Sequence, residues 1–243
     1  MCWLIKSVIS LCVNFYYLGC WIILLVAGVD EAGRGCVIGP LVVAGVALYE
    51  EQLPNLTTLG VNDSKLLSEK KRNSIFKELM DLIQTFKIIK VPPFEIDKAV
   101  DCQIRLQKLN RLEAKTMAQI IEHLCPDEVY VDAADTIEKR FATHIRECLN
   151  FKPKIISRHK ADKLYPIVSA ASIIAKVERD KEIDLLRTEF GDFGSGYMHD
   201  KKTQNFLTEW LKINKNYPSC VRKSWEPVKK ALSERDTTQQ KLF

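Results

Sequence analysis

The sequence has few of the features that distinguish non-globular proteins. Its 243 residues include only 10 glycines and 9 prolines, with no internal repeat or low-complexity tract, which excludes collagen-like, solenoid and disordered chains. Its eight cysteines include no Cys-x-x-Cys pair, which excludes the common structural zinc modules. Because 47% of the residues are hydrophobic and 28% are charged, we expect a globular protein of one domain, with or without a small appendage.

The chain also lacks a strong excess of charge of either sign. Lysine and arginine together number 36 against 31 acidic residues, which leaves a net charge of +5. Such a mild basic excess permits a polyanionic partner such as nucleic acid but does not require one. The class of partner therefore depends on the motifs.

Charged residues are absent from Ser7 to Val29, a run long enough to span a bilayer. A lysine before the run and small residues within it also fit a cleaved signal peptide. The run continues into an acidic motif with no polar linker, so residues 22–29 are expected to form a buried strand. Residues 1–22 are then an apolar extension or a misassigned start. We expect a cytoplasmic protein, with membrane anchoring through residues 1–26 left open.

Beyond this start, strand-like and helix-like segments alternate along the chain. Continuous apolar or β-branched runs predict strands, and apolar residues at helical spacing predict helices. The first two strand-like runs are joined by a short connection, so we expect an antiparallel hairpin. The alternation favours an α/β layered fold with a helical C-terminal part. The expected strands are residues 22–29, 37–49, 86–91, 128–135 and 154–159, and the expected helices are 68–84, 104–124, 136–149, 166–190 and 204–232, the last interrupted at 216–218.

Carboxylates stand at three similar places, where an apolar strand ends or a helix begins. In open α/β sheets the ends of strands are where sites assemble. Converging carboxylates repel one another unless a hard cation lies among them, and Mg²⁺ prefers carboxylate oxygens. Two such ions form a known clamp for phosphodiester cleavage. The sequence therefore predicts a divalent-metal site formed by Asp30 with Glu31, by Asp132 and by Asp162.

These assignments have structural alternatives. A single acidic residue at the end of an element is more often a cap or turn residue. The segment from Asp135 to Glu138 fits a capping box, so we assign Asp135 to structure and Asp132 to chemistry. Adjacent residues of a strand point to opposite faces, so Glu31 joins Asp30 only if the chain leaves strand geometry there.

Two glycine-rich loops carry candidate substrate contacts. Gly33 and Gly35 let the backbone approach a ligand closely, and Arg34 between them suits a phosphate or a sugar edge. The second loop, residues 194–197, ends in Tyr197, which can stack on a base or sugar. Each loop alone is weak evidence, because tight turns and half-buried packing use the same residue types. Basic residues near these positions, which suit a groove that follows phosphates, include Lys65, Arg158 and Lys160.

Taken in order, these motifs resemble those of ribonuclease HII, the type 2 ribonuclease H family, and most closely its archaeal branch. The resemblance spans about residues 24–232. The matching stretches are "GVDEAGRG", "DSK" at 63–65, "VYVDAAD", "HKAD", "SAASIIAKV", "GSGY" and "VRKSW". Two positions depart from the usual family pattern: Cys36 stands where proline is frequent, and Met198-His199-Asp200 replaces Pro-Ser-Asp.

The resemblance implies an RNase H-like mixed sheet flanked by helices, with a helical C-terminal appendage. It implies that the four acidic residues named above are catalytic and bind two Mg²⁺ or Mn²⁺ ions. It also implies that Gly33, Arg34 and Gly35 read the 2′-hydroxyl of a ribonucleotide, while Tyr197 packs under the sugar at an RNA–DNA junction. We divide the chain into an extension (1–22), a catalytic core (23–190), a substrate loop with a C-terminal helical part (191–232) and a flexible tail (233–243).

The function implied is an endonuclease that cuts the RNA strand of RNA–DNA hybrids, including single ribonucleotides embedded in duplex DNA. The expected products carry 5′-phosphate and 3′-hydroxyl ends. One alternative is another RNase H-like nuclease, such as a resolvase or transposase, which has no use for a 2′-hydroxyl sensor. Another is a catalytically idle module that binds hybrids. We expect a monomer, and the terminal "QQKLF" weakly suggests a sliding-clamp peptide.

Overall fold

The computed structural model describes residues 23–61, 67–102 and 108–240, with side chains described as far as residue 235. In these residues five strands form one sheet in the order β3-β2-β1-β4-β5. The strands are β1 (Leu25–Ala32), β2 (Leu41–Tyr49), β3 (Thr85–Val91), β4 (Glu128–Asp132) and β5 (Lys154–Arg158). The β1–β2 and β2–β3 pairs are antiparallel, which confirms the predicted hairpin, whereas β1–β4 and β4–β5 are parallel. The sheet is therefore mixed, as expected.

Strand β1 differs from its prediction at both ends. It starts at Leu25 and continues through Glu31 to Ala32, and these last two residues pair with Val43 and Val42 of β2. Glu31 therefore stays in strand geometry, and the condition stated above for it to join Asp30 is not met. The partner strand extends far enough to hold Asp30 and Glu31 in the ladder, so their side chains leave on opposite faces.

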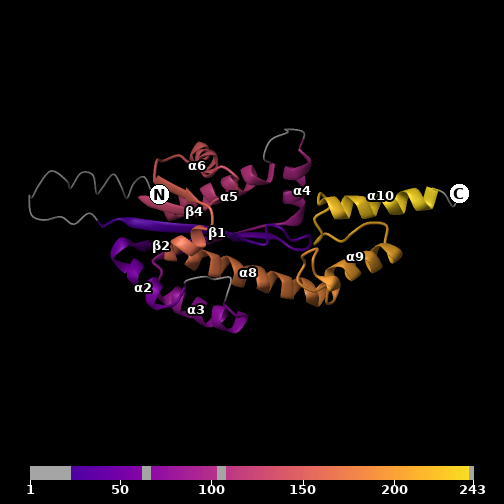
Figure 1. The fold of residues 1–243 in the computed structure, drawn as a ribbon, viewed down its shortest axis with the longest axis horizontal. Helices are drawn as coiled ribbons and strands as arrows, with labels where there is room; N and C mark the ends of the chain where they lie inside the picture. Colours follow the sequence, from indigo (N-terminus) through magenta and orange to yellow (C-terminus); the bar gives the residue numbers. More distant parts are fainter. Residues whose placement is uncertain (1–22, 62–66, 103–107, 241–243) are drawn as a thin grey trace, which may run out of the picture.

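Helices cover both faces of the sheet (Figure 1). On one face lie α2, α3 and α8, and on the other lie α4, α5 and α6. The helical elements are a 3-10 turn (Glu50–Gln52), α2 (Leu53–Thr58), α3 (Glu69–Leu82), α4 (Pro93–Asp101), α5 (Lys108–Leu124), α6 (Glu138–Glu147), α7 (Ala161–Leu164), α8 (Pro166–Phe190), α9 (Lys201–Ile213) and α10 (Glu226–Gln240). This arrangement confirms the predicted α/β class with helices on both sides of a mixed sheet.

Several helices depart from the expected elements: α2, α4 and α7 have no expected counterpart, and α10 ends later than expected. Helix α4 was not expected, because Pro92-Pro93 marks the end of a strand equally well, yet proline fits the first turn of a helix. Helix α10 extends to Gln240, beyond residue 232, where the sequence analysis ends the helical part. Other starts agree: α3 begins after its predicted cap Ser68, whose hydroxyl accepts from the Lys71 amide at 3.3 Å.

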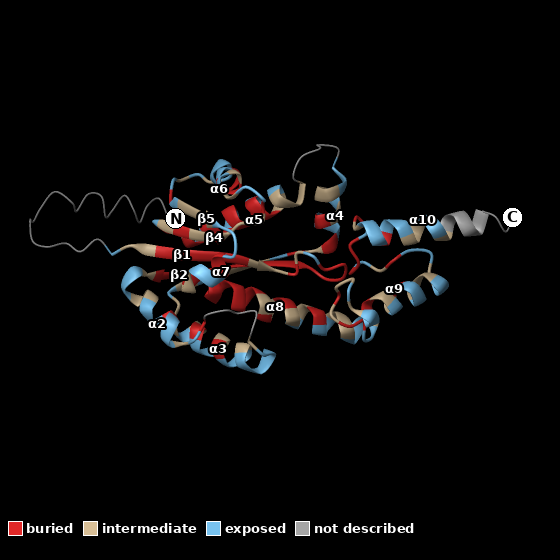
Figure 2. Ribbon diagram, in the orientation of Figure 1, coloured by how far each residue is buried: buried red, intermediate tan, exposed pale blue. Residues whose placement is uncertain are grey.

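The sheet is buried on both faces, and Figure 2 shows the centre of β1 and the start of α8 as buried. Helix α8 packs very closely on β1. A Cβ atom added to Gly28 would lie 2.3 Å from the Ile167 carbonyl oxygen, so this approach of helix to strand requires glycine. Helix α5 covers the opposite face, where Ile120 and Met117 are fully buried. The end of β1 is thereby fixed from both sides.

A third buried cluster joins the C-terminal part to the sheet. It contains Val37 and Ile38, which follow the glycine turn after β1, together with Phe193, Leu207 and Val221. Ile38 forms an antiparallel bridge with Val221, and the Gly39 amide donates to the Cys220 carbonyl at 2.8 Å. The segment after α9 therefore packs directly against the turn that follows β1.

The last residues of the uncharged N-terminal run, Leu25 to Val29, belong to β1. Among residues 23–61, 67–102 and 108–240, no helix combines the length and apolar character needed to cross a bilayer. The predicted extension, residues 1–22, and the predicted contact Lys65 lie outside the described residues.

Candidate functional site

Three aspartates meet at one end of the central strands. Asp30 lies near the end of β1, Asp132 is the last residue of the parallel neighbour β4, and Asp162 lies in the short helix α7. Each can offer a carboxylate oxygen, and these three oxygens all lie within 4.8 Å of one another. Residues separated by more than a hundred positions are thus combined into a single acidic cluster because β1 and β4 run parallel side by side.

Backbone amides hold the aspartates in place. The Glu31 amide donates to Asp30 Oδ1 at 2.7 Å, and the Ala161 amide donates to Asp132 Oδ1 at 3.2 Å. The side chain of Ser172, from α8, also bonds Asp30. These contacts fix the orientation of the carboxylates, which is what a preorganised ion site requires.

Without a positive counter-charge, the carboxylates of the cluster repel one another. Asp30 is 4% exposed and Asp162 is 1% exposed. Burial, reinforced by the neighbouring charge of Asp132, raises the pKa of Asp30 to about 7. An all-oxygen donor set of crowded carboxylates fits hard divalent cations, because their charge removes the repulsion. The observed residues therefore fit the predicted ion site.

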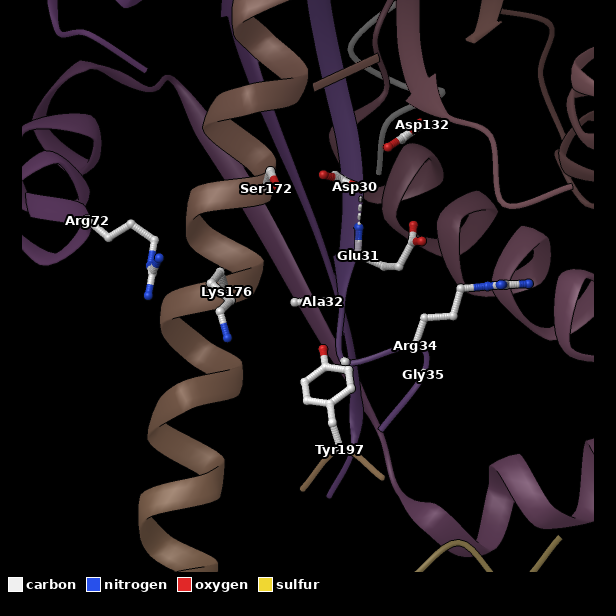
Figure 3. Close-up of a pocket in the computed structure, with 11 residues that line it drawn as sticks. Asp30, Glu31, Ala32, Arg34, Gly35, Arg72, Asp132, Ser172, Lys176 and Tyr197 are labelled. Atoms are coloured by element: carbon white, nitrogen blue, oxygen red, sulfur yellow. Dashed lines mark hydrogen bonds between the residues drawn. The ribbon is translucent and has the colours of Figure 1, made fainter. Parts of the chain in front are cut away.

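Glu31 lies beside this cluster and is not one of its three members. Figure 3 shows the Asp30 carboxylate turned towards Ser172, whereas the Glu31 side chain leaves β1 on the side of Arg34. Burial, followed by the charge of Asp30, raises the pKa of Glu31 well above its usual value. Its Oε2 is buried and has no hydrogen-bond partner in the described part of the chain. Both acids line one pocket.

The turn after β1 contains two glycines with different constraints. Gly33 has a φ of +82°, and an added Cβ would lie 2.8 Å from the Pro40 carbonyl oxygen. Gly33 is therefore required by the backbone itself. At Gly35 the same atom would meet only the Tyr197 ring, at 3.9 Å, which is an ordinary contact. Gly35 keeps the space above Tyr197 open, and the fold does not demand it.

A buried arginine from the C-terminal part holds this turn. Arg222 is fully buried and donates to the carbonyls of Gly33 at 2.7 Å, Arg34 at 2.8 Å and Gly39 at 3.0 Å. Its guanidinium also lies 5.0 Å from the centre of the Trp225 ring. Burial lowers the pKa of Arg222 to about 10, so it stays charged at neutral pH. Arg222 lies in the motif "VRKSW", but nothing in the local sequence indicates this role.

The second glycine loop is bonded to the first. The Gly196 carbonyl accepts from the amides of Val37 and Ile38 at 2.8 and 3.1 Å. Arg179 of α8 donates to the Ser195 carbonyl and, at 2.9 Å, to Cys36 Sγ, and its guanidinium lies 5.1 Å from the centre of the Tyr197 ring. Tyr197 is thereby placed next to Gly35, as Figure 3 shows. Burial, followed by the neighbouring Cys36, raises the pKa of the Tyr197 hydroxyl.

Two of the basic residues predicted to contact substrate do not line the acidic pocket. Arg158 pairs with Glu138 at 3.2 Å and lines a separate hollow beside α6, and neither Arg158 nor Lys160 lines the acidic pocket. The cations that do line it, besides Arg34, are Arg72 of α3 and Lys176 of α8. Lys176 occurs in a motif noted in the sequence, but Arg72 carried no local signal, because only the packing of α3 beside α8 brings it to the pocket.

Asp135 has a structural role, as predicted, but not through the predicted capping box, because the N-cap of α6 is Ile137, which makes no side-chain cap. The Asp135 carboxylate accepts from the Ile137 amide at 3.0 Å and forms an ion pair with Arg140. Bonding to Arg140 lowers the pKa of Asp135. His159 contacts the Asp135 carbonyl through Nε2 at 2.7 Å. These contacts stabilise the connection between Asp132 and α6.

The geometry can be compared with known proteins. The family model described as ribonuclease HII matches residues 27–228, which is most of the chain. The chain belongs to the ribonuclease HII family. Ribonuclease HII of Pyrococcus furiosus is 45% identical over 207 residues, covering 84% of this chain and 90% of the relative. The predicted family and enzyme class, a ribonuclease, are thereby confirmed.

Solved ribonuclease HII structures agree with the fold. The crystal structure of ribonuclease H2 from Pyrococcus horikoshii is 42% identical, with a TM-score of 0.80 over 87% of this chain and 98% of that chain. The ribonuclease HII of Archaeoglobus fulgidus, solved as a complex with PCNA, is 43% identical, with a TM-score of 0.75 over 84% of this chain and 96% of that chain. The mixed sheet with flanking helices is therefore the family fold.

Proposed function

We propose that the protein is an endonuclease that hydrolyses the RNA strand of RNA–DNA hybrids, including single ribonucleotides embedded in duplex DNA. Its products carry 5′-phosphate and 3′-hydroxyl ends. The observation that carries the proposal is the convergence of three aspartate carboxylates next to two linked glycine loops and Tyr197. Membership of a ribonuclease family supports the same reaction class.

The proposed ligands of two Mg²⁺ or Mn²⁺ ions are Asp30, Asp132 and Asp162, together with Glu31, which leaves the strand on the other side from Asp30 but lines the same pocket. When bound, two divalent ions activate the attacking water and stabilise the leaving oxygen. The protein's part is to hold the four carboxylates close together in one pocket, where burial raises the pKa of Asp30 and Glu31. The amides of Glu31 and Ala161 keep Asp30 and Asp132 oriented throughout.

Recognition of ribose is assigned to the linked loops. The flat ring of Tyr197 and the open space above Gly35 form a surface on which a sugar can rest. Backbone groups of residues 33–35 border that space and can bond a hydroxyl there. A 2′-hydroxyl both donates and accepts, so its presence or absence distinguishes RNA from DNA at one position.

Phosphate contacts are assigned to cations on the opposite wall of the pocket. Lys176 and Arg72 lie there on α8 and α3, and both are ion-paired with Asp180, at 2.7 and 3.3 Å. The shared partner keeps the two cations side by side. Phosphates of a bound strand can then be neutralised without sequence preference. Arg158, Lys160 and Lys65 remain proposed contacts with more distant phosphates.

One experiment distinguishes this function from its alternatives. A DNA duplex with a single ribonucleotide is incubated with the protein and Mg²⁺ or Mn²⁺, beside an all-DNA duplex. We expect incision only at the ribonucleotide, and no incision by Asp132→Asn. Equal cutting of both duplexes would indicate a resolvase-like nuclease, and binding without incision would indicate an idle binding module.

We also propose a monomeric cytoplasmic enzyme whose C-terminal tail contacts a sliding clamp. The Archaeoglobus relative is described in a complex with PCNA, and α10 directs the chain away from the sheet (Figure 1). Gel filtration of the full chain with PCNA, compared with a chain ending at Thr238, tests the contact. A shift that both chains share would show that the tail is not the contact, and fractionation of cells tests the location.

A further inference from the structure

The side chain of Arg34 is directed away from the proposed ribose space. Its Nε donates to Glu113 Oε1 at 2.8 Å, and its Nη2 donates to Asn110 Oδ1 at 2.8 Å and to the Ala134 carbonyl at 3.3 Å. In Figure 3 the guanidinium extends to the side opposite Lys176 and away from the Tyr197 ring. The Nε and Nη2 donors of Arg34 are therefore occupied by protein acceptors.

Glu113 is an unusual residue for the face of α5 that packs on the sheet. Its side chain is fully buried, whereas the Arg34 side chain is 40% exposed. The second oxygen, Oε2, has no hydrogen-bond partner among the described residues. A buried carboxylate is costly unless it is paired, and Arg34, which bonds Glu113, is the main group that offsets this cost, with a smaller contribution from the charge of Arg222.

The contacts of Arg34 connect three separate elements around the pocket. The arginine itself belongs to the turn after β1, Glu113 and Asn110 belong to α5, and Ala134 lies two residues beyond the proposed ligand Asp132. Because Glu113 is fully buried in the packing of α5, the helix fixes the arginine and the arginine fixes the turn.

We propose that Glu113 is a positioning residue for ribose recognition. It holds the Arg34 side chain against α5, so that the peptide groups of residues 33–35, rather than the guanidinium, border the space above Tyr197. This inference rests on the proposed function, because it explains how the turn is kept ready for a 2′-hydroxyl. The competing arrangement, in which the guanidinium of Arg34 binds the substrate directly, predicts different behaviour for Glu113 variants.

The test measures selectivity for ribose as well as rate. Glu113→Gln keeps the shape of the side chain but replaces the charged acceptor, and Arg34→Ala removes its partner. Dissociation constants for a single-ribonucleotide duplex and an all-DNA duplex are measured in the Asp132→Asn background, and kcat and KM are measured with Asp132 intact. Glu122→Gln, on the same helix but bonded to Asn150, is the matched control.

We expect Glu113→Gln and Arg34→Ala each to reduce the preference for the ribonucleotide duplex about 5- to 10-fold, mainly through KM, which is the range of one hydrogen bond. The double variant should be no worse than either single variant, because both remove one contact. Glu122→Gln should match the parent. Loss of stability alone would weaken both duplexes equally and leave the preference unchanged.

Three results would overturn the inference. If Arg34→Ala reduces the preference while Glu113→Gln does not, the guanidinium acts on the substrate directly. If neither changes the preference, the pair has no part in recognition. If the parent protein shows no preference for ribose at all, the proposed function fails and this inference with it. Glu113→Gln could misfold, which a lost thermal transition would reveal. In that case Arg34→Ala and Arg34→Lys still separate the two arrangements, because a lysine at position 34 can keep one bond to Glu113.

Discussion

The acidic cluster and the two glycine loops lie side by side in one pocket, yet they are held in opposite ways. Asp30 and its acidic neighbours are crowded, and burial raises the pKa of Asp30 to about 7. In the loops, by contrast, Arg222 satisfies three carbonyls, and Gly196 accepts two amides. The first region is a source of instability that a cation relieves, and the second is stable by itself.

This difference separates stability from activity. Sites assembled for chemistry commonly cost stability, and removing their charges often stabilises the fold while abolishing the reaction. Buried clamps behave otherwise, because removing one partner leaves other polar groups without bonds. Substitutions in the two regions should therefore move stability in opposite directions while both reduce activity.

The largest effect is expected for Asp30→Asn. Loss of a carboxylate from the ion clamp should lower kcat by roughly 10³-fold or more, because such a clamp supplies several kcal/mol of transition-state stabilisation. The metal-free variant should melt about 2–4 °C higher than the parent at pH 8, for about 1 kcal/mol of relieved repulsion in a chain of this size. Single-turnover kinetics and calorimetry in EDTA check both. A lower melting temperature would contradict the comparison.

The next effect is expected for Arg222→Met. The methionine fills much of the space but leaves the carbonyls of Gly33, Arg34 and Gly39 without their donor, at a cost of about 3 kcal/mol in the free energy of unfolding. Ribonucleotide cleavage should fall together with stability. Lys223→Met is the control, because Lys223 is the next residue along the chain and its side chain is exposed. Denaturant titration measures the difference, and equal stability of the two variants would refute the clamp.

The acidic region was far easier to predict from sequence than the clamp. Asp30 and Asp132 each follow a run of apolar residues, and the order of strands and helices brings such positions together, so the local pattern was sufficient. Arg222 contacts Gly33 across 189 positions, a relation that no local pattern contains. The end of β1 was missed for the same reason, since pairing with β2 extends the strand through Ala32.

Glu113 could be predicted from the sequence only in part. An acidic residue on the packed face of a helix that is otherwise apolar is a signal that the sequence does contain. The sequence pattern does not show which residue pairs with Glu113, because Arg34 lies 79 positions away and reaches α5 only after the turn has formed. Sequence reasoning therefore assigned Arg34 to the substrate, whereas the structure directs its guanidinium to protein acceptors.

A smaller effect separates the two glycines of the first loop. Gly33→Ala must adopt a positive φ and meet the Pro40 carbonyl, so it should lose about 1–3 kcal/mol of stability. Gly35→Ala meets only the Tyr197 ring at 3.9 Å, and its stability should stay within about 0.5 kcal/mol of the parent. Its methyl group occupies the proposed ribose space, so ribonucleotide cleavage should nevertheless fall. Chemical denaturation and cleavage assays distinguish the pair, and destabilisation by Gly35→Ala would refute the division.

The smallest expected effect is on how stability depends on pH, and divalent ions should alter this dependence. Between the unfolded pKa of Asp30, 3.8, and its folded pKa of about 7, the metal-free native state binds more protons than the unfolded state. Its stability should therefore decrease as pH rises from about 4 to 7 and level off above, by the linkage of proton binding to folding.

Divalent ions need the deprotonated carboxylate, so Mg²⁺ or Mn²⁺ should raise the melting temperature more at pH 8 than at pH 5. Thermal scans with EDTA and with each ion across this range measure the difference, and Asp30→Asn should flatten it. An ion effect that is the same at both pH values would mean that Asp30 is not the group whose proton the ion displaces. Crowding of negative charge at Asp30 would then not be the property that distinguishes the acidic cluster from the loops.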